Sequence, residues 1–253
     1  RHEKPPVFLI AYNTEFVKSQ QNLIFMIAAA YFVAGKLSLF LSIPPGFATP
    51  VWPSAGIALA AILIFGYRYL PGVFIGSFAT NLMVALDAGA LVSTLTPHLV
   101  AAGIAVGAVL QATLGAWLVK RTVSIPTTFN HPKEPISLLI GGGIFGCIVN
   151  AIIGPWVLFI ADVIPGEIYF TSVFTWWVGD VIGVILFAPM LLLVANKANS
   201  NIRKFIVGGP VIVFTAIALL SFLNIKESQF KDKQNAFEVI ARDIATEFEK
   251  DIE

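Results

Sequence analysis

Long apolar runs constrain this chain more than any other feature of its sequence. Seven such runs occur, several of them about twenty residues long, the length that crosses a bilayer as a helix. Hydrophobic residues make up 57 % of the chain and charged residues 12 %, and most charges lie between the runs. We therefore predict an all-α fold, a polytopic transmembrane helical bundle of about seven spans. The expected spans are residues 22–42, 53–66, 70–86, 97–119, 135–161, 168–194 and 205–223.

The second and third runs are short, and residues 66–72 connect them. This connection holds two glycines and a proline, which is typical of a tight turn. We therefore expect these two runs to form a hairpin.

Positive charges mark one side of the predicted bundle. Short loops rich in lysine and arginine stay in the cytoplasm. The alternate connections, around residues 44–51, near Asp87 and at residues 162–167, are uncharged or acidic, so we expect them to face outward. The N-terminus is then cytoplasmic. The cations that carry this prediction are Arg1, Lys4, Lys18, Arg68, Lys120, Arg121, Lys133, Lys197, Arg203 and Lys204.

The two ends of the chain differ from its centre. We expect residues 1–20 to be a cytoplasmic segment, residues 21–224 the membrane domain, and residues 225–253 an extracytoplasmic helix. In that last segment apolar residues recur at helical spacing from Phe237 to Ile252, which predicts an amphipathic helix. We expect it to be the start of a further domain, with both ends cut from a longer protein. The alternative is a stand-alone protein with a surface helix.

Few residues suit metal or covalent chemistry. The three histidines are far apart in the sequence, and a single cysteine, Cys147, excludes an intramolecular disulfide. We expect no catalytic residue, no metal, no cofactor and no nucleic-acid partner. Glycines four residues apart instead predict close helix packing in the bilayer. These pairs are Gly72 with Gly76, Gly103 with Gly107, Gly142 with Gly146, and Gly179 with Gly183.

Polar side chains inside the expected spans are few. An ionisable group at such depth is costly, and a functional site is the first hypothesis for it. From the expected span ends, this set leans toward the outer half of the bundle. The residues are Lys36, Asn81, Gln111, Asn150 and Asp180.

Asp180 follows two tryptophans in the segment that begins at Thr175. Trp176 is four residues from Asp180 and Trp177 is three, so all three share one side of a helix. The carboxylate can accept a hydrogen bond, an indole N–H can donate one, and the rings can hold an apolar body. Trp52 marks the outer mouth of the second span. The sequence therefore predicts an outward-opening pocket built around Asp180.

Other interpretations of Asp180 remain open. It can pair with Lys36, or face Asn81 or Asn150, and only hold helices together. The same polar groups suit a small-molecule transporter, although the sequence has no convincing inverted repeat. A proton or ion sensor is a further alternative. An intramembrane enzyme would need more reactive groups at one depth.

Three motifs resemble the MASE1 domain, the first class of membrane-associated sensor domains of bacteria. They are PVWPSAGIALA at residues 50–60, LPGVFIGSFATN at residues 70–81 and TWWVGDVIGVILFAP at residues 175–189. The resemblance implies a sensory input module in the bacterial inner membrane. It also implies a cytoplasmic output, usually a histidine kinase, a diguanylate cyclase or a cyclic-di-GMP phosphodiesterase, and such an output favours a homodimer. The segment after residue 230 resembles the opening of a CHASE-type ligand domain.

The residues themselves suggest the kind of ligand. A mostly apolar pocket with one carboxylate and several indoles suits an amphiphile with an amide and a carbonyl in its head. Acyl-homoserine lactones have this form. We expect the amide N–H to bind Asp180 and the ring carbonyl to bind Trp52, Trp176 or Trp177. The candidate ligand-binding residues are Asp180, Trp176, Trp177, Trp52, Asn81, Asn150, Lys36 and Thr175.

Overall fold

The computed structural model describes residues 7–39, 49–91, 94–125, 127, 129, 131, 133–196 and 209, with side chains from residue 18 onward. The chain divides into two units, Arg1–Gly208 and Gly209–Glu253, and the fold below is that of the first. All regular structure in the described residues is helical, as the apolar runs predict.

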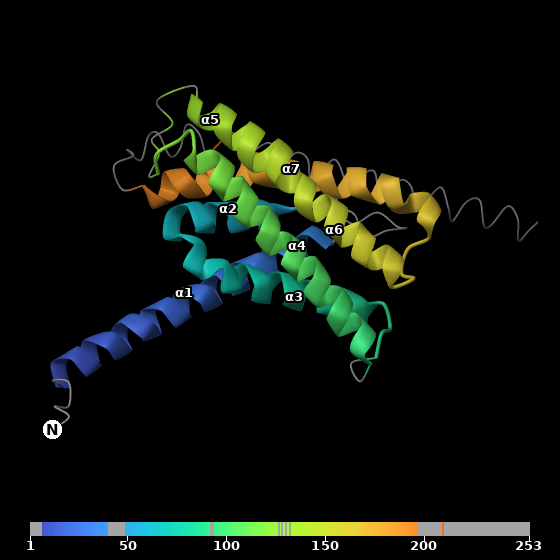
Figure 1. Ribbon diagram of the computed structural model, residues 1–253, viewed down its shortest axis with the longest axis horizontal. Helices are drawn as coiled ribbons and strands as arrows, with labels where there is room; N and C mark the ends of the chain where they lie inside the picture. The colour runs from blue at the N-terminus through green and yellow to red at the C-terminus, as the bar shows by residue number, and fades with distance from the viewer. Residues whose placement is uncertain are drawn as a thin grey trace, which may run out of the picture. The chain divides into compact units, whose positions relative to one another are not determined.

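Seven α-helices follow one another in the described residues (Figure 1). A 3₁₀ turn precedes α3, another precedes α7, and a π-helical segment joins α5 to α6. The elements are α1 (Val7–Leu39), α2 (Pro53–Phe65), η1 (Tyr67–Tyr69), α3 (Leu70–Asp87), α4 (Leu95–Lys120), α5 (Lys133–Ser137), η2 (Leu138–Phe145), α6 (Gly146–Ile160), η3 (Gly166–Ile168) and α7 (Tyr169–Ala195).

Five helical segments in the described residues are long and apolar enough to cross a membrane. They correspond to the first and the third to sixth expected spans and are Lys18–Leu39, Tyr67–Asp87, Leu95–Lys120, Lys133–Ile160 and Gly166–Ala195. The second expected span is the shorter helix α2, with 13 residues. The seventh span and the helix expected at residues 225–253 lie outside the described residues. The count of seven and the cytoplasmic N-terminus stay predictions.

Helix α2 forms the centre of the packing although it is the shortest of the apolar helices. It packs mainly against α7, and also against α1 and α4, while α3 packs against α1 and α4. The turn between α2 and α3 is present as η1, but the two helices do not pair as the expected hairpin. The reason is that α2 is apolar on every side, with Leu59 and Ile62 completely enclosed. It therefore gains more from burial among three helices than from one partner.

The long helices present large apolar side chains on their outer surfaces. Phe25 is 74 % exposed and Phe170 is 80 % exposed, and similar residues occur on α3, α4 and α6. Apolar surface on this scale is rare on soluble monomers. It matches the hydrocarbon layer of a bilayer, which supports a multi-pass membrane protein.

Each of the four predicted glycine pairs lies against another element. Gly72 and Gly76 contact α1, and a Cβ at either position would meet backbone or side-chain atoms of that helix. Gly103 and Gly107 contact α6 in the same way. Gly142 lies against Leu59 of α2, and Gly146 lies against α4. These three pairs therefore lie in tight contacts between helices, as the sequence predicts, against backbone atoms at some positions and side chains at others.

The fourth pair has a different partner. Gly179 and Gly183 of α7 lie against the extended segment that enters α2, at the carbonyl groups of Thr49 and Trp52. The amide of Trp52 donates a hydrogen bond to the carbonyl oxygen of Gly179 at 2.9 Å. Non-helical backbone is thus satisfied by a neighbouring helix, as it must be at membrane depth.

Candidate functional site: a polar cavity among five helical elements

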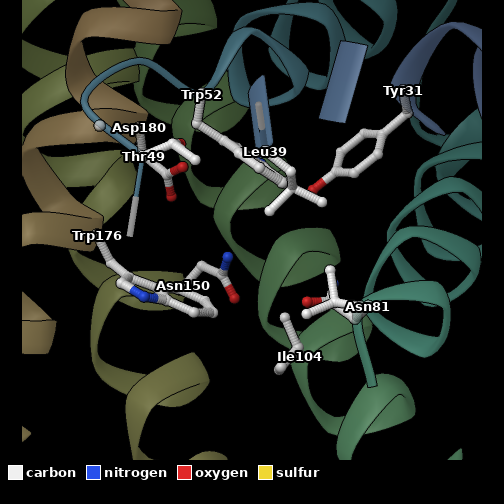
Figure 2. Close-up of a pocket in the computed structure, with 11 residues that line it drawn as sticks. Tyr31, Leu39, Thr49, Trp52, Asn81, Ile104, Asn150, Trp176 and Asp180 are labelled. Atoms are coloured by element: carbon white, nitrogen blue, oxygen red, sulfur yellow. The ribbon is translucent and has the colours of Figure 1, made fainter. Parts of the chain in front are cut away.

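A cavity of about 50 Å³ lies among α1, α3, α4, α6 and α7, next to the extended segment before α2 (Figure 2). Asp180, Trp176 and Asn150 lie on one side of it, and Tyr31 and Asn81 on the opposite side. The lining residues are Tyr31, Leu39, Thr49, Trp52, Asn81, Val84, Ile104, Asn150, Trp176, Gly179 and Asp180.

Trp176 and Asp180 reach the cavity from one face of α7, because residues four apart are neighbours on a helix. The Trp176 ring lies against Gly154 of α6, where a Cβ would collide with it. Asn150, one turn earlier on α6, places its Oδ1 against Gly107 of α4. Glycines on two neighbouring helices therefore make room for two of the polar side chains of the site.

Three polar side chains form a buried cluster. Asp180 is 4 % exposed, Asn150 4 % and Gln111 7 %. The side-chain amides of Gln111 and Asn150 are the groups that face the Asp180 carboxylate. One acceptor oxygen on each of the three side chains still lacks a hydrogen-bond partner among the described residues, and so does Nε1 of Trp176.

Orphaned polar atoms are the chemical signature of this cavity. Only five buried side-chain atoms in the described part of the chain lack a partner; three belong to this cluster and a fourth is Nε1 of Trp176. These four atoms comprise three acceptors and one donor. Each unsatisfied buried group costs about 1–3 kcal/mol. A molecule that both donates and accepts hydrogen bonds here would remove part of that cost.

Tyr31 faces this cluster from α1. Its hydroxyl is within hydrogen-bonding reach of the Ser77 hydroxyl and the Trp52 indole. Its backbone carbonyl accepts a hydrogen bond of 2.8 Å from Ser54 Oγ on α2. Asn81 donates through Nδ2 to the carbonyl of Ser77 at 2.9 Å, so its own helix holds it at the cavity wall.

Three candidate residues from the sequence lie outside the cavity lining. Lys36 pairs with Asp87 through a 2.7 Å contact, so the ion pair considered between Lys36 and Asp180 is not formed. Trp177 donates through Nε1 to the carbonyl of Ile144 at 2.9 Å and packs against the main core. Thr175 bonds back to its own helix, with Oγ1 3.0 Å from both the Thr171 and the Ser172 carbonyl oxygens.

The remaining five candidates, Asp180, Trp176, Trp52, Asn81 and Asn150, line one cavity. Gln111 is predicted as a polar residue inside a span, but its sequence position does not place it near the site. Tyr31 is not among the predicted site residues, although its polar hydroxyl inside the first span is a signal that could have identified it. Leu39, Thr49 and Ile104 carry no sequence signal that separates them from other residues of their segments.

A second cavity of about 450 Å³ adjoins the first, and we call it the vestibule. The two share the lining residues Asn81, Val84, Ile104 and Trp176, and we call this shared boundary the throat. The vestibule continues past the end of α3 and the start of α4 to the end of α6. Its walls are mostly apolar. The smaller cavity is also lined mostly by apolar surface, but Asp180 and Asn150 line it and not the vestibule.

No group of three or more His, Cys, Asp or Glu side chains that could hold a metal occurs in the described residues. The polar groups of the cavity are instead a carboxylate, amides, indoles and a phenol. This set suits hydrogen bonding to an organic molecule.

Comparison with known proteins gave one match. A family model, MASE1, matches residues 21–226, which is most of the chain. Neither the curated proteins nor the solved structures contain a match. The matched residues include every wall of the cavity and the vestibule. The chain therefore belongs to the MASE1 family and is a membrane-associated sensory domain, without catalytic function of its own.

Proposed function

We propose that this chain is the sensory input domain of a bacterial signalling protein and that it binds a small amphiphilic molecule in the polar cavity. The cluster of orphaned polar atoms around Asp180 carries this proposal. The free acceptors of Asp180 and Asn150 and the free donor of Trp176, unpaired among the described residues, belong to residues that line the cavity. Polar groups at membrane depth are normally paired within the protein. A ligand head group is the partner that would satisfy them.

An acyl-homoserine lactone is the ligand class that we propose. Its amide N–H would donate to Oδ2 of Asp180, and a carbonyl oxygen would accept from Nε1 of Trp176. These two atoms are a free acceptor and a free donor among the described residues. The aromatic faces of Trp52 and Tyr31 would enclose the remainder of the head group.

The ligand would enter from the outer side of the inner membrane. From the α3–α4 connection, Ala88, Gly89, Ala90, Leu91 and Thr94 line the vestibule, and Val163 lines it from the α6–α7 connection. Both connections lack lysine and arginine between the helices, whereas Arg68, Lys120 and Arg121 lie at the opposite helix ends. The positive-inside rule therefore supports outward access and a cytoplasmic N-terminus.

A signal requires two conformations with different ligand affinity. Helix α7 carries Asp180 and Trp176 and packs against α2 and α6. We propose that it is the element that moves when the cavity is filled. Pro189 lies within α7 toward the proposed cytoplasmic end and removes one helical hydrogen bond there. The output we propose is a histidine kinase, a diguanylate cyclase or a cyclic-di-GMP phosphodiesterase acting in a homodimer.

The test is calorimetric binding of a C8 acyl-homoserine lactone to the protein in lipid nanodiscs. We expect saturable binding, weakened roughly ten- to hundredfold in Asp180→Ala, because a hydrogen bond to a charged group contributes about 1.5–3 kcal/mol. Trp176→Phe keeps the ring and removes the donor, and should also weaken binding. The matched control is Trp156→Phe, whose ring is exposed on α6 and should leave affinity unchanged.

Wild-type affinity in the Asp180 and Trp176 variants would contradict the proposed site. Absence of binding in wild type would contradict the ligand class. Net movement of labelled lactone across proteoliposomes at a steady rate would instead favour the transporter alternative.

A further inference from the structure

The polar cavity is too small to hold a whole amphiphile. One buried water needs roughly 10–15 Å³ of such volume, so 50 Å³ accommodates a few waters or a compact head group. Ligand pockets for larger molecules measure about 300–1,000 Å³. The vestibule, at about 450 Å³, lies in that range. A ligand anchored at Asp180 must therefore pass its remaining atoms through the throat.

Two of the four throat residues are aliphatic. They are Val84 of α3 and Ile104 of α4, with Trp176 beside them. Asn81 is the polar residue there, and its amide already donates to the Ser77 carbonyl. Among the described residues, the free donor of the throat is Nε1 of Trp176, which the head group would use, and an alkyl chain can then lie against Val84 and Ile104.

The vestibule walls contain several small residues. Ala85 lies near the end of α3, and Ala88, Gly89 and Ala90 follow directly after that helix, while Val100 of α4 and Leu158 of α6 also line the vestibule. Small side chains on one wall leave the space that larger ones would fill. The length of this space limits how much of a chain can be buried.

We infer that the vestibule is the binding subsite for the apolar chain of the ligand and that it selects ligands by chain length. This inference rests on the proposed function, since the head group must be held in the polar cavity. Affinity then rises with each methylene that enters the vestibule and stops rising when the vestibule is full. Each buried methylene is expected to increase affinity about fourfold.

The experiment compares C4, C8 and C12 acyl-homoserine lactones on wild type, Ala85→Phe and Val100→Phe in nanodiscs, with membrane partitioning of each lactone subtracted. The two variants fill the vestibule from α3 and from α4 respectively. The matched control is Ala30→Phe, at an exposed position of α1. Thermal unfolding of each variant reports whether it is folded.

We expect wild type to bind C8 more tightly than C4. Both vestibule variants should lose at least tenfold in affinity for the longer lactones and less than twofold for C4, and Ala30→Phe should match wild type. Equal losses at every chain length, or no loss in either variant, would overturn the vestibule subsite. If binding is equally tight at all lengths yet lost in Asp180→Ala, the receptor function stands and the subsite does not. Absence of binding at every length overturns both.

Discussion

The backbone amide of Trp52 donates a hydrogen bond to the carbonyl oxygen of Gly179, at 2.9 Å, across two segments far apart in the sequence. This bond holds the entry to α2 against α7 beside the polar cavity. It requires close backbone contact, which Gly179 and Gly183 permit because neither has a side chain. Trp52, which lines the cavity, is therefore bonded directly to α7, the helix that carries Asp180.

Gly183→Ala should destabilise the protein, because its Cβ would collide with the Trp52 carbonyl group. Overpacking of this kind costs about 1–3 kcal/mol. Thermal unfolding in nanodiscs measures the loss. Gly143→Ala is the matched control, since the nearest atom to its Cβ would be 3.7 Å away. A Gly183→Ala variant as stable as the control would show that this contact is not needed.

The adjacent tryptophans should respond differently to replacement by phenylalanine. Trp177→Phe removes the donor to the Ile144 carbonyl and should cost about 1 kcal/mol of stability. Trp176→Phe breaks no hydrogen bond among the described residues and should mainly weaken ligand binding. Unfolding and calorimetry on both variants separate the effects. Equal stability losses in the two would contradict this division.

Gly154→Ala should disturb the cavity through Trp176. Its Cβ would press on the indole ring and move it, so we expect at least a tenfold loss of lactone affinity together with reduced stability. The double variant with Trp176→Phe should regain part of the stability, because the smaller ring leaves room. If the double variant regains no stability, the destabilisation by Gly154→Ala comes from a contact other than the one with Trp176. The measurements are calorimetry and thermal unfolding.

The Lys36–Asp87 ion pair should contribute little. Its side chains are 29 % and 55 % exposed, and a pair of this kind contributes at most about 1 kcal/mol. A double-mutant cycle with Lys36→Ala and Asp87→Ala measures the coupling. Lactone affinity should stay within twofold in each variant. A tenfold loss of lactone affinity in Lys36→Ala, without a similar loss in Asp87→Ala, would indicate that Lys36 contacts the ligand.

Much of the membrane architecture could be predicted because span length and apolar composition are local properties. The expected spans at residues 97–119, 135–161 and 168–194 agree with the structure within a few residues at each end. The hairpin prediction was wrong because it used the turn alone. Which helices surround α2 depends on the burial that each partner offers, and no short segment contains that information.

The site shows the same division at the level of single residues. The sequence by itself determined that Asp180 is a costly group inside a span, that indoles adjoin it, and that glycines allow close packing around it. Only the tertiary structure decided that Asn150 and Gln111 face Asp180 while Lys36 pairs with Asp87. The rotation of α7 likewise placed Trp176 in the cavity and Trp177 on the Ile144 carbonyl. Successive residues point about 100° apart on a helix, so packing between distant segments, rather than sequence proximity, selects which side chains meet.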